Sequence, residues 1–114
     1  MKAVFVELPA FERRRAEYFD DAAFGEFQQL LMLHPEAGDL IQGTGGLRKL
    51  RFADKRRGKG KRGGLRVIYY WWNNGFQFWL FTVYDKDEMA DLTAAQRKAF
   101  KEMIKKELDA RRRL

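Results

Sequence analysis

The chain has 114 residues, of which 46% are hydrophobic and 15% aromatic, a composition that forms a packed core and excludes an intrinsically disordered chain. This length fits one domain, so we expect a single unit over residues 1–114. There is no cysteine, which excludes disulfide frameworks, thiolate zinc sites and cysteine nucleophiles. No apolar run reaches the roughly 20 residues of a membrane-spanning helix, and the N-terminus lacks a signal-peptide pattern. We therefore expect a soluble, cytoplasmic protein without membrane contact.

The positive charge is concentrated in one segment. Lys and Arg outnumber Asp and Glu by 23 to 16, a net charge of +7. Between Leu47 and Arg66 there are ten basic residues and a single acid, Asp54, so the rest of the chain is slightly acidic. Seven of the ten glycines fall between Gly43 and Gly64, and glycine permits close approach to the backbone. Such a segment attracts polyanions; a solvated loop that only aids solubility is the simpler alternative.

The first part of the chain predicts a strand followed by two helices. Residues 1–7 carry the β-branched and aromatic side chains typical of a short strand. Pro9 suits the first turn of a helix. The Asp20-Asp21 pair can cap a second helix, whose apolar stripe ends before Pro35. Residues 36–46 are expected to form a loop.

The rest of the chain predicts three strands and a last helix. Residues 47–53 alternate apolar and basic side chains, and residues 65–72 and 76–84 are rich in β-branched and aromatic types. Asn73-Asn74-Gly75 indicates a hairpin turn in which Asn or Gly adopts a positive φ. Thr93 and Gln96 match a capping box at the start of the last helix. The order β-α-α-β-β-β-α predicts an α+β domain with a small, mostly antiparallel sheet packed by helices.

The cationic segment could carry phosphate chemistry on RNA. Such chemistry needs a base for the 2′-hydroxyl proton, cations around the phosphorus and an acid for the leaving oxygen. Repulsion among cations lowers a lysine's pKa and frees its neutral form, while Arg presents a planar fork to phosphate oxygens. Arg66 is the most constrained candidate because it projects from a strand. The other candidates for this chemistry are Lys55, Lys59, Lys61 and Arg62. The basic residues expected to bind RNA are Arg48, Lys49, Arg51, Arg56, Arg57 and Arg62.

Nine aromatic residues crowd the predicted hairpin of residues 65–84. Three helices can cover only one face of a small sheet, so some of these rings are expected on the other face. Core packing explains most of them, and the alternative is a stacking platform for bases or a docking face for a partner. Tyr84, at a strand end near polar residues, is the best candidate for contact with a nucleotide.

Other chemistries find little support in the sequence. His34 is the single histidine, which excludes RNases with two catalytic histidines and fits a turn residue. The four acids between residues 85 and 91 lack the spacing of a calcium loop, so a solvated turn explains them, and no metal or other cofactor is expected. Gly43-Thr44-Gly45-Gly46 lacks the lysine ending of a phosphate-binding loop and precedes a strand.

Three stretches carry a resemblance to a known family. Residues 43–51 (GTGGLRKLR), 58–70 (GKGKRGGLRVIYY) and 83–92 (VYDKDEMADL) resemble the RelE/ParE toxin superfamily, and most of all its HigB branch. The resemblance covers nearly the whole chain. It implies a RelE-like fold and a metal-independent endoribonuclease, the toxin of a type II toxin–antitoxin pair. Such a toxin cleaves mRNA in the ribosomal A site by attack of the 2′-hydroxyl on the phosphodiester.

The resemblance also implies roles and partners. Carried onto this chain by position, the catalytic set comprises Arg66, Lys59, Lys61, Lys55, Tyr84 and Lys86. Asp87 stands where the family pattern has a basic residue. The implied partners are the ribosome with its mRNA and an antitoxin of the helix-turn-helix class, through which the complex would contact DNA. Two alternatives stay open: a ParE-like inhibitor of DNA gyrase, and a nucleic-acid-binding module without enzymatic activity.

Overall fold

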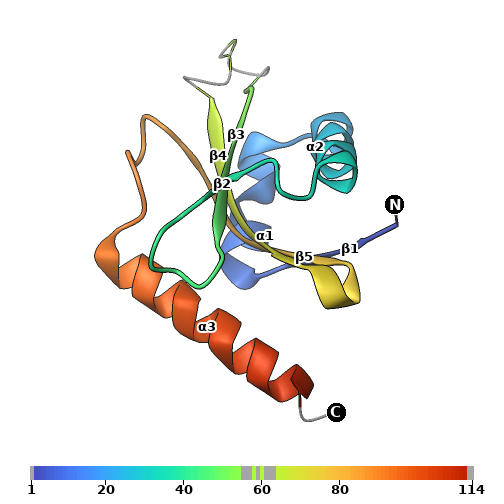
Figure 1. Cartoon of the computed structure of the whole chain (residues 1–114). Helices are drawn as coiled ribbons and strands as arrows, with labels where there is room; N and C mark the ends of the chain where they lie inside the picture. Colours follow the sequence, from blue (N-terminus) through green and yellow to red (C-terminus); the bar gives the residue numbers. More distant parts are fainter. Residues whose placement is uncertain (1, 55–57, 59, 61–63, 113–114) are drawn as a thin grey trace.

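The computed structural model describes residues 2–54, 58, 60 and 64–112 (Figure 1). The elements follow the order β1 (Val4–Glu7), α1 (Pro9–Tyr18), α2 (Asp21–Leu33), β2 (Asp39–Leu40), β3 (Arg48–Phe52), β4 (Leu65–Trp72), a 3₁₀ turn (Asn73–Gly75), β5 (Gln77–Asp85) and α3 (Ala94–Arg112). In this described part of the chain, five strands form one sheet in the order β1-β5-β4-β3-β2. β1 is parallel to β5, and the remaining pairs are antiparallel. The expected α+β class is confirmed.

The helices begin where the sequence predicts. Pro9 occupies the first turn of α1, where its missing N–H costs nothing. The Asp20 carboxylate accepts a hydrogen bond from the Ala23 backbone N–H at 2.8 Å and so caps α2. At the start of α3, the Thr93 hydroxyl accepts from the Gln96 N–H at 3.1 Å, and the Gln96 side-chain oxygen accepts from the Thr93 N–H at 2.9 Å.

The stretch 36–46, expected to be a loop throughout, contains the two-residue strand β2. Asp39 is paired with Lys49 and Leu40 with Arg48. The fully buried Thr44 closes the turn after β2, because its hydroxyl donates to the Ile41 carbonyl at 2.5 Å and accepts from the Leu47 N–H at 3.2 Å. The element order therefore gains one short strand at the edge of the sheet.

The hairpin between β4 and β5 is confirmed, but its turn differs from the expected type. The positive φ falls on Phe76, at 51°, and on none of the three residues before it. Phe76 closes the 3₁₀ turn by donating its N–H to the Asn73 carbonyl at 3.3 Å. Gly75 is needed for a different reason: the ring of Trp72 fills the space that a Cβ would occupy.

Helices cover both faces of the sheet, which corrects the expectation that one face stays uncovered (Figure 1). One core joins α1 and α2 to the sheet through residues such as Phe11, Phe27 and Val67. The other core lies under α3 and includes Ile68, Phe81, Tyr84, Leu92 and Ile104. Most rings of the β4–β5 hairpin are therefore buried, whereas Phe76 is 52% exposed. Within the described residues, no helix has both the length and the apolar character needed to cross a bilayer.

Gly64, at the base of the cationic loop, provides a test of this packing. A Cβ on Gly64 would overlap the Phe52 carbonyl oxygen and lie 2.7 Å from that of Gly60. We expect Gly64→Ala to lower the free energy of unfolding by about 1–3 kcal/mol, measured by urea denaturation. Gly25→Ala is the matched control, because nothing lies within 4 Å of its added Cβ on α2. Gly25→Ala should stabilise the protein by about 0.5–1 kcal/mol. Equal effects of the two substitutions would contradict the close packing around Gly64.

Candidate functional site

The sheet register gathers three strand residues at one end of the α3 face. Arg51 on β3 is paired with Arg66 on β4, and Arg66 is paired with Tyr84 on β5. Directly paired residues of antiparallel strands point to the same face, and Lys49, two residues before Arg51, shares that face. We call Lys49, Arg51, Arg66 and Tyr84 the arginine corner. It is the place where the described part of the cationic segment meets the aromatic hairpin.

Arg66 is the most enclosed cation of the arginine corner. Only 5% of the residue is exposed, and its guanidinium lies 3.5 Å from the Gly64 carbonyl oxygen and 3.4 Å from that of Leu65. A guanidinium presents a planar fork of N–H donors that matches the oxygens of a phosphate. The strand backbone and these carbonyls hold the charge at the base of the cationic loop.

Tyr84 lies fully buried beside Arg66, in the core under α3. Its hydroxyl has no hydrogen-bond partner among the described residues. Burial raises the pKa of Tyr84 above its usual value of 10.0; the carboxylate of Asp91 raises it further, while Arg66 and Arg97 lower it. The side chain is therefore a neutral phenol at pH 7, able to donate a proton in a hydrogen bond but not to act as a base. Because Tyr84 is fully buried, a nucleotide could contact it only if the residues that cover it moved. The predicted contact stays a prediction.

Asp91 joins Lys49 of the corner to a further cation, Arg97 of α3. Its carboxylate lies 3.8 Å from the Lys49 ammonium and 3.2 Å from the Arg97 guanidinium, and it accepts the Leu92 N–H at 2.8 Å. Sequence reasoning assigned Asp91 to a solvated turn and did not single out Arg97. No local sequence signal indicates the contact between Asp91 and Lys49, because Lys49 lies on β3, far from Asp91 in the sequence.

The other predicted site residues divide into three groups. Arg48 is not part of the corner: it points to the opposite face, where it donates to the Gly38 carbonyl at 2.8 Å and pairs with Glu36 at 3.7 Å. Lys86 is exposed, and its backbone N–H donates to the Gly64 carbonyl at 3.4 Å, beside the loop base. The predicted residues that lie outside the described residues are Lys55, Arg56, Arg57, Lys59, Lys61 and Arg62.

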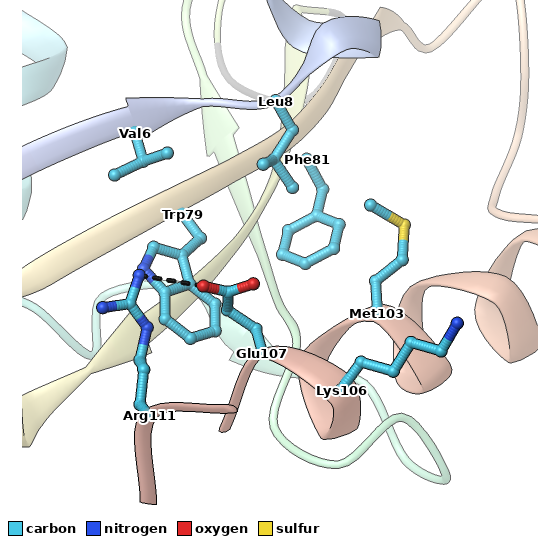
Figure 2. A pocket seen from close by; sticks show the side chains of 8 residues that line it. All are labelled: Val6, Leu8, Trp79, Phe81, Met103, Lys106, Glu107 and Arg111. Carbon is cyan, nitrogen blue, oxygen red and sulfur yellow. Dashed lines mark ion pairs between the residues drawn. The ribbon is translucent and has the colours of Figure 1, made fainter. Parts of the chain in front are cut away.

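A hollow of about 380 Å³ lies away from these charges, between β1, β5 and α3 (Figure 2). Its wall from the sheet consists of Val6, Leu8, Trp79 and Phe81. On the α3 side, Glu107 and Arg111 form an ion pair at 3.1 Å and so largely neutralise each other. This mostly apolar lining offers little to bind a phosphate.

Within residues 2–54, 58, 60 and 64–112, no three His, Cys, Asp or Glu side chains come together in a way that could hold an ion. The groups that can act at the corner are therefore cations and a phenol. Together they can bind and neutralise an anion such as a phosphodiester.

No family model matches the sequence. Among solved structures, the chain is similar to a double arginine-to-alanine mutant of the Escherichia coli toxin RelE in the free state. The TM-score is 0.51 with 11% sequence identity, over 79% of this chain and 90% of that one. This similarity establishes the fold, and the RelE-like fold expected from the sequence is confirmed.

Three tyrosines with raised pKa values predict a loss of stability at high pH. Burial raises the pKa of Tyr69, Tyr70 and Tyr84, so the folded state holds these protons more tightly than the unfolded state does. Their stabilising effect is complete below pH ~10, the unfolded pKa, and is lost as the pH rises through the folded pKa values. Urea titrations across this range should show the free energy of unfolding falling. The decline should be smaller in Tyr84→Phe than in the parent.

At neutral pH, Tyr84→Phe should unfold at the same urea concentration as the parent or at a higher one, because its hydroxyl has no partner among the described residues. Tyr69→Phe is the control, since its hydroxyl donates to the Pro35 carbonyl at 2.8 Å and accepts from the Gly38 N–H at 3.0 Å. That substitution should cost about 1–3 kcal/mol. A cost of similar size for Tyr84→Phe would refute the assignment of an unpartnered hydroxyl.

Proposed function

We propose that this protein is a RelE-type toxin of the HigB-like branch, an endoribonuclease that cleaves mRNA in the ribosomal A site. The observation that carries the proposal is the arginine corner, in which Lys49, Arg51 and Arg66 share one face at the base of a cationic loop. The RelE-like fold supports it. A fold alone does not fix a function, so the chemistry of the corner must carry the rest.

The proposed reaction is an intramolecular transfer within the RNA. The 2′-hydroxyl oxygen forms a bond to the neighbouring phosphorus while the bond from phosphorus to the 5′-oxygen breaks. A base accepts the 2′-hydroxyl proton, and an acid donates a proton to the departing 5′-oxygen. The products are a 2′,3′-cyclic phosphate and a free 5′-hydroxyl. Negative charge builds on the phosphoryl oxygens in the transition state, and fixed cations stabilise it.

Arg66 is proposed as the main stabiliser of this charge. Its guanidinium is already removed from water and held in place, so little reorganisation is needed when the phosphorane forms. Arg51, directly opposite on β3 and exposed, would contact the same phosphate from the solvent side. The sequence alone predicts that Lys49 and Arg51 bind RNA. Their position beside Arg66 makes both candidates for contact with the scissile phosphate.

The acid and base are proposed from the remaining cations. The candidates for the base are Lys55, Lys59 and Lys61 of the cationic loop. The candidate for the acid is Lys86, whose backbone N–H is bonded to the Gly64 carbonyl at the end of this loop. Tyr84, paired with Arg66 across the sheet, stays a candidate catalytic residue of the corner. No cofactor enters this scheme.

The proposed partners follow from the same function. A toxin of this kind is held inactive by an antitoxin, which we expect to be a helix-turn-helix protein that contacts DNA for the complex. An acidic segment of the antitoxin would neutralise the arginine corner. The working partner is the ribosome with its mRNA, and the proposed place of action is the cytoplasm.

The test is cleavage of an mRNA during translation in a reconstituted system. Arg66→Ala should reduce the cleavage rate roughly 10²–10³-fold, the effect of losing a group that acts mainly in the transition state. Arg51→Gln, which changes an exposed side chain, should reduce it roughly tenfold without affecting folding. Arg13→Gln, which changes an exposed side chain of α1, is the matched control and should cleave at the parental rate.

Equal cleavage by the Arg66 variant and the parent would remove Arg66 from the mechanism. Inhibition of gyrase supercoiling without any mRNA cleavage would favour the ParE-like alternative. RNA binding without cleavage or growth arrest would leave a nucleic-acid-binding module.

A further inference from the structure

The flank of α3 next to the arginine corner carries a row of cations. Arg97, Lys101, Lys105 and Arg112 are spaced by four, four and seven residues, so they lie on one side of the helix. From Arg97 to Arg112 this row spans about 22 Å at the helical rise per residue. We call these four residues the α3 basic row.

A groove of about 260 Å³ runs beside the basic row. Lys101, Lys105 and Arg112 line it together with Leu108, and the turn at Gly45 forms the facing wall. Gly43 and Gly45 have φ of 74° and 76°, a backbone conformation that favours glycine. Because the exposed Gly45 has no side chain, a ligand can approach its backbone closely.

The charges of the basic row are only partly balanced. Asp91 pairs with Arg97 at 3.2 Å, and Asp109 pairs with Arg112 at 3.8 Å. Among the described residues, no ion pair engages Lys101 or Lys105, and both side chains are exposed. The middle of the groove is therefore its most cationic part, with a glycine turn opposite.

The basic row reaches the arginine corner through Asp91. Arg97, the first cation of the row, shares the carboxylate of Asp91 with Lys49 of the corner. A strand of phosphates bound at the corner would therefore meet the next available cations along α3. A row of point charges with an open, side-chain-free wall suits a phosphate backbone better than it suits a small, fully enclosed anion.

We propose that the groove between α3 and the Gly43–Gly46 turn binds the phosphate backbone of the RNA strand that flanks the cleaved phosphodiester. The choice of RNA rests on the proposed function. Lys101 and Lys105 would each neutralise one phosphate and release its counterion. The groove would hold the strand in register with the arginine corner without taking part in the chemistry.

The test uses the full chain and a fluorescent single-stranded 2′-O-methyl RNA, which cannot be cleaved by 2′-hydroxyl attack. Lys101→Gln/Lys105→Gln should weaken binding roughly tenfold and reduce the salt slope of the logarithmic affinity by about 1.4, as expected for two lost phosphate contacts. The matched control is Arg13→Gln/Lys106→Gln, which removes two exposed charges from other surfaces. Its salt slope should equal that of the parent. Melting curves establish that both variants fold.

Parallel cleavage assays during translation separate this inference from the proposed function. Cleavage by the parent, together with a raised KM and an unchanged kcat in the groove variant, supports both. Cleavage by the parent with unchanged RNA binding in the groove variant overturns the groove and leaves the function in place. Absence of cleavage by the parent, with the expected loss of binding in the groove variant, overturns the function and leaves the groove. Equal losses of RNA affinity in the groove variant and its control would show that only net charge matters, and would refute the proposed groove.

Discussion

The irregular register between β4 and β5 is the constraint on which the arrangement of the site depends. Ile68 is paired with Thr82, but its neighbour Tyr69 is paired with Leu80, so Phe81 is an extra residue in β5. A bulge of this kind reverses the alternation of side chains on one side of it relative to the other. It lets Tyr84 share the α3 face with Phe81 instead of the face of Leu80. Without the bulge, Tyr84 of the arginine corner and Phe81 of the core under α3 would lie on opposite faces of the sheet.

The two ends of the α3 face have different roles. Under the helix, Phe81 packs on Phe100 with ring centroids 5.1 Å apart, and Ile104 is buried against the sheet. Near the C-terminus of α3, the Arg111 guanidinium lies over the Trp72 ring at 4.4 Å and over the Trp79 ring at 5.1 Å. These contacts fix the helix on the sheet, so its N-terminal end and its basic flank are held at a constant place beside the corner.

Placing several cations at one end of a sheet has an electrostatic cost, and the fold offsets part of it. Arg66 is buried against backbone carbonyls, and Asp91 is shared by Lys49 and Arg97. A single carboxylate between two cations reduces their repulsion while leaving a net positive charge for an anion. Asp91 is thus a structural counter-charge, a role that its sequence neighbours do not reveal.

The folded elements were predictable because their signals are local. Pro9, Asp20 and the Thr93–Gln96 pair act on backbone groups within a few residues, so helix starts can be predicted from short stretches of sequence. The same is true of the β-rich segments. The predicted type of the hairpin turn was wrong. Two features determine the turn together: the Trp72 ring packed over Gly75 and the left-handed backbone of Phe76.

The sequence by itself determined the α+β class, the order of the principal elements and the concentration of positive charge, since each follows from residue type and short-range spacing. Only the tertiary structure decided which cations share a face, that helices cover both sides of the sheet, and that Tyr84 is buried beside Arg66. The physical reason is that strand register and helix docking are set by packing summed over distant segments. A slip of one residue, like the bulge at Phe81, exchanges the faces without changing any local propensity.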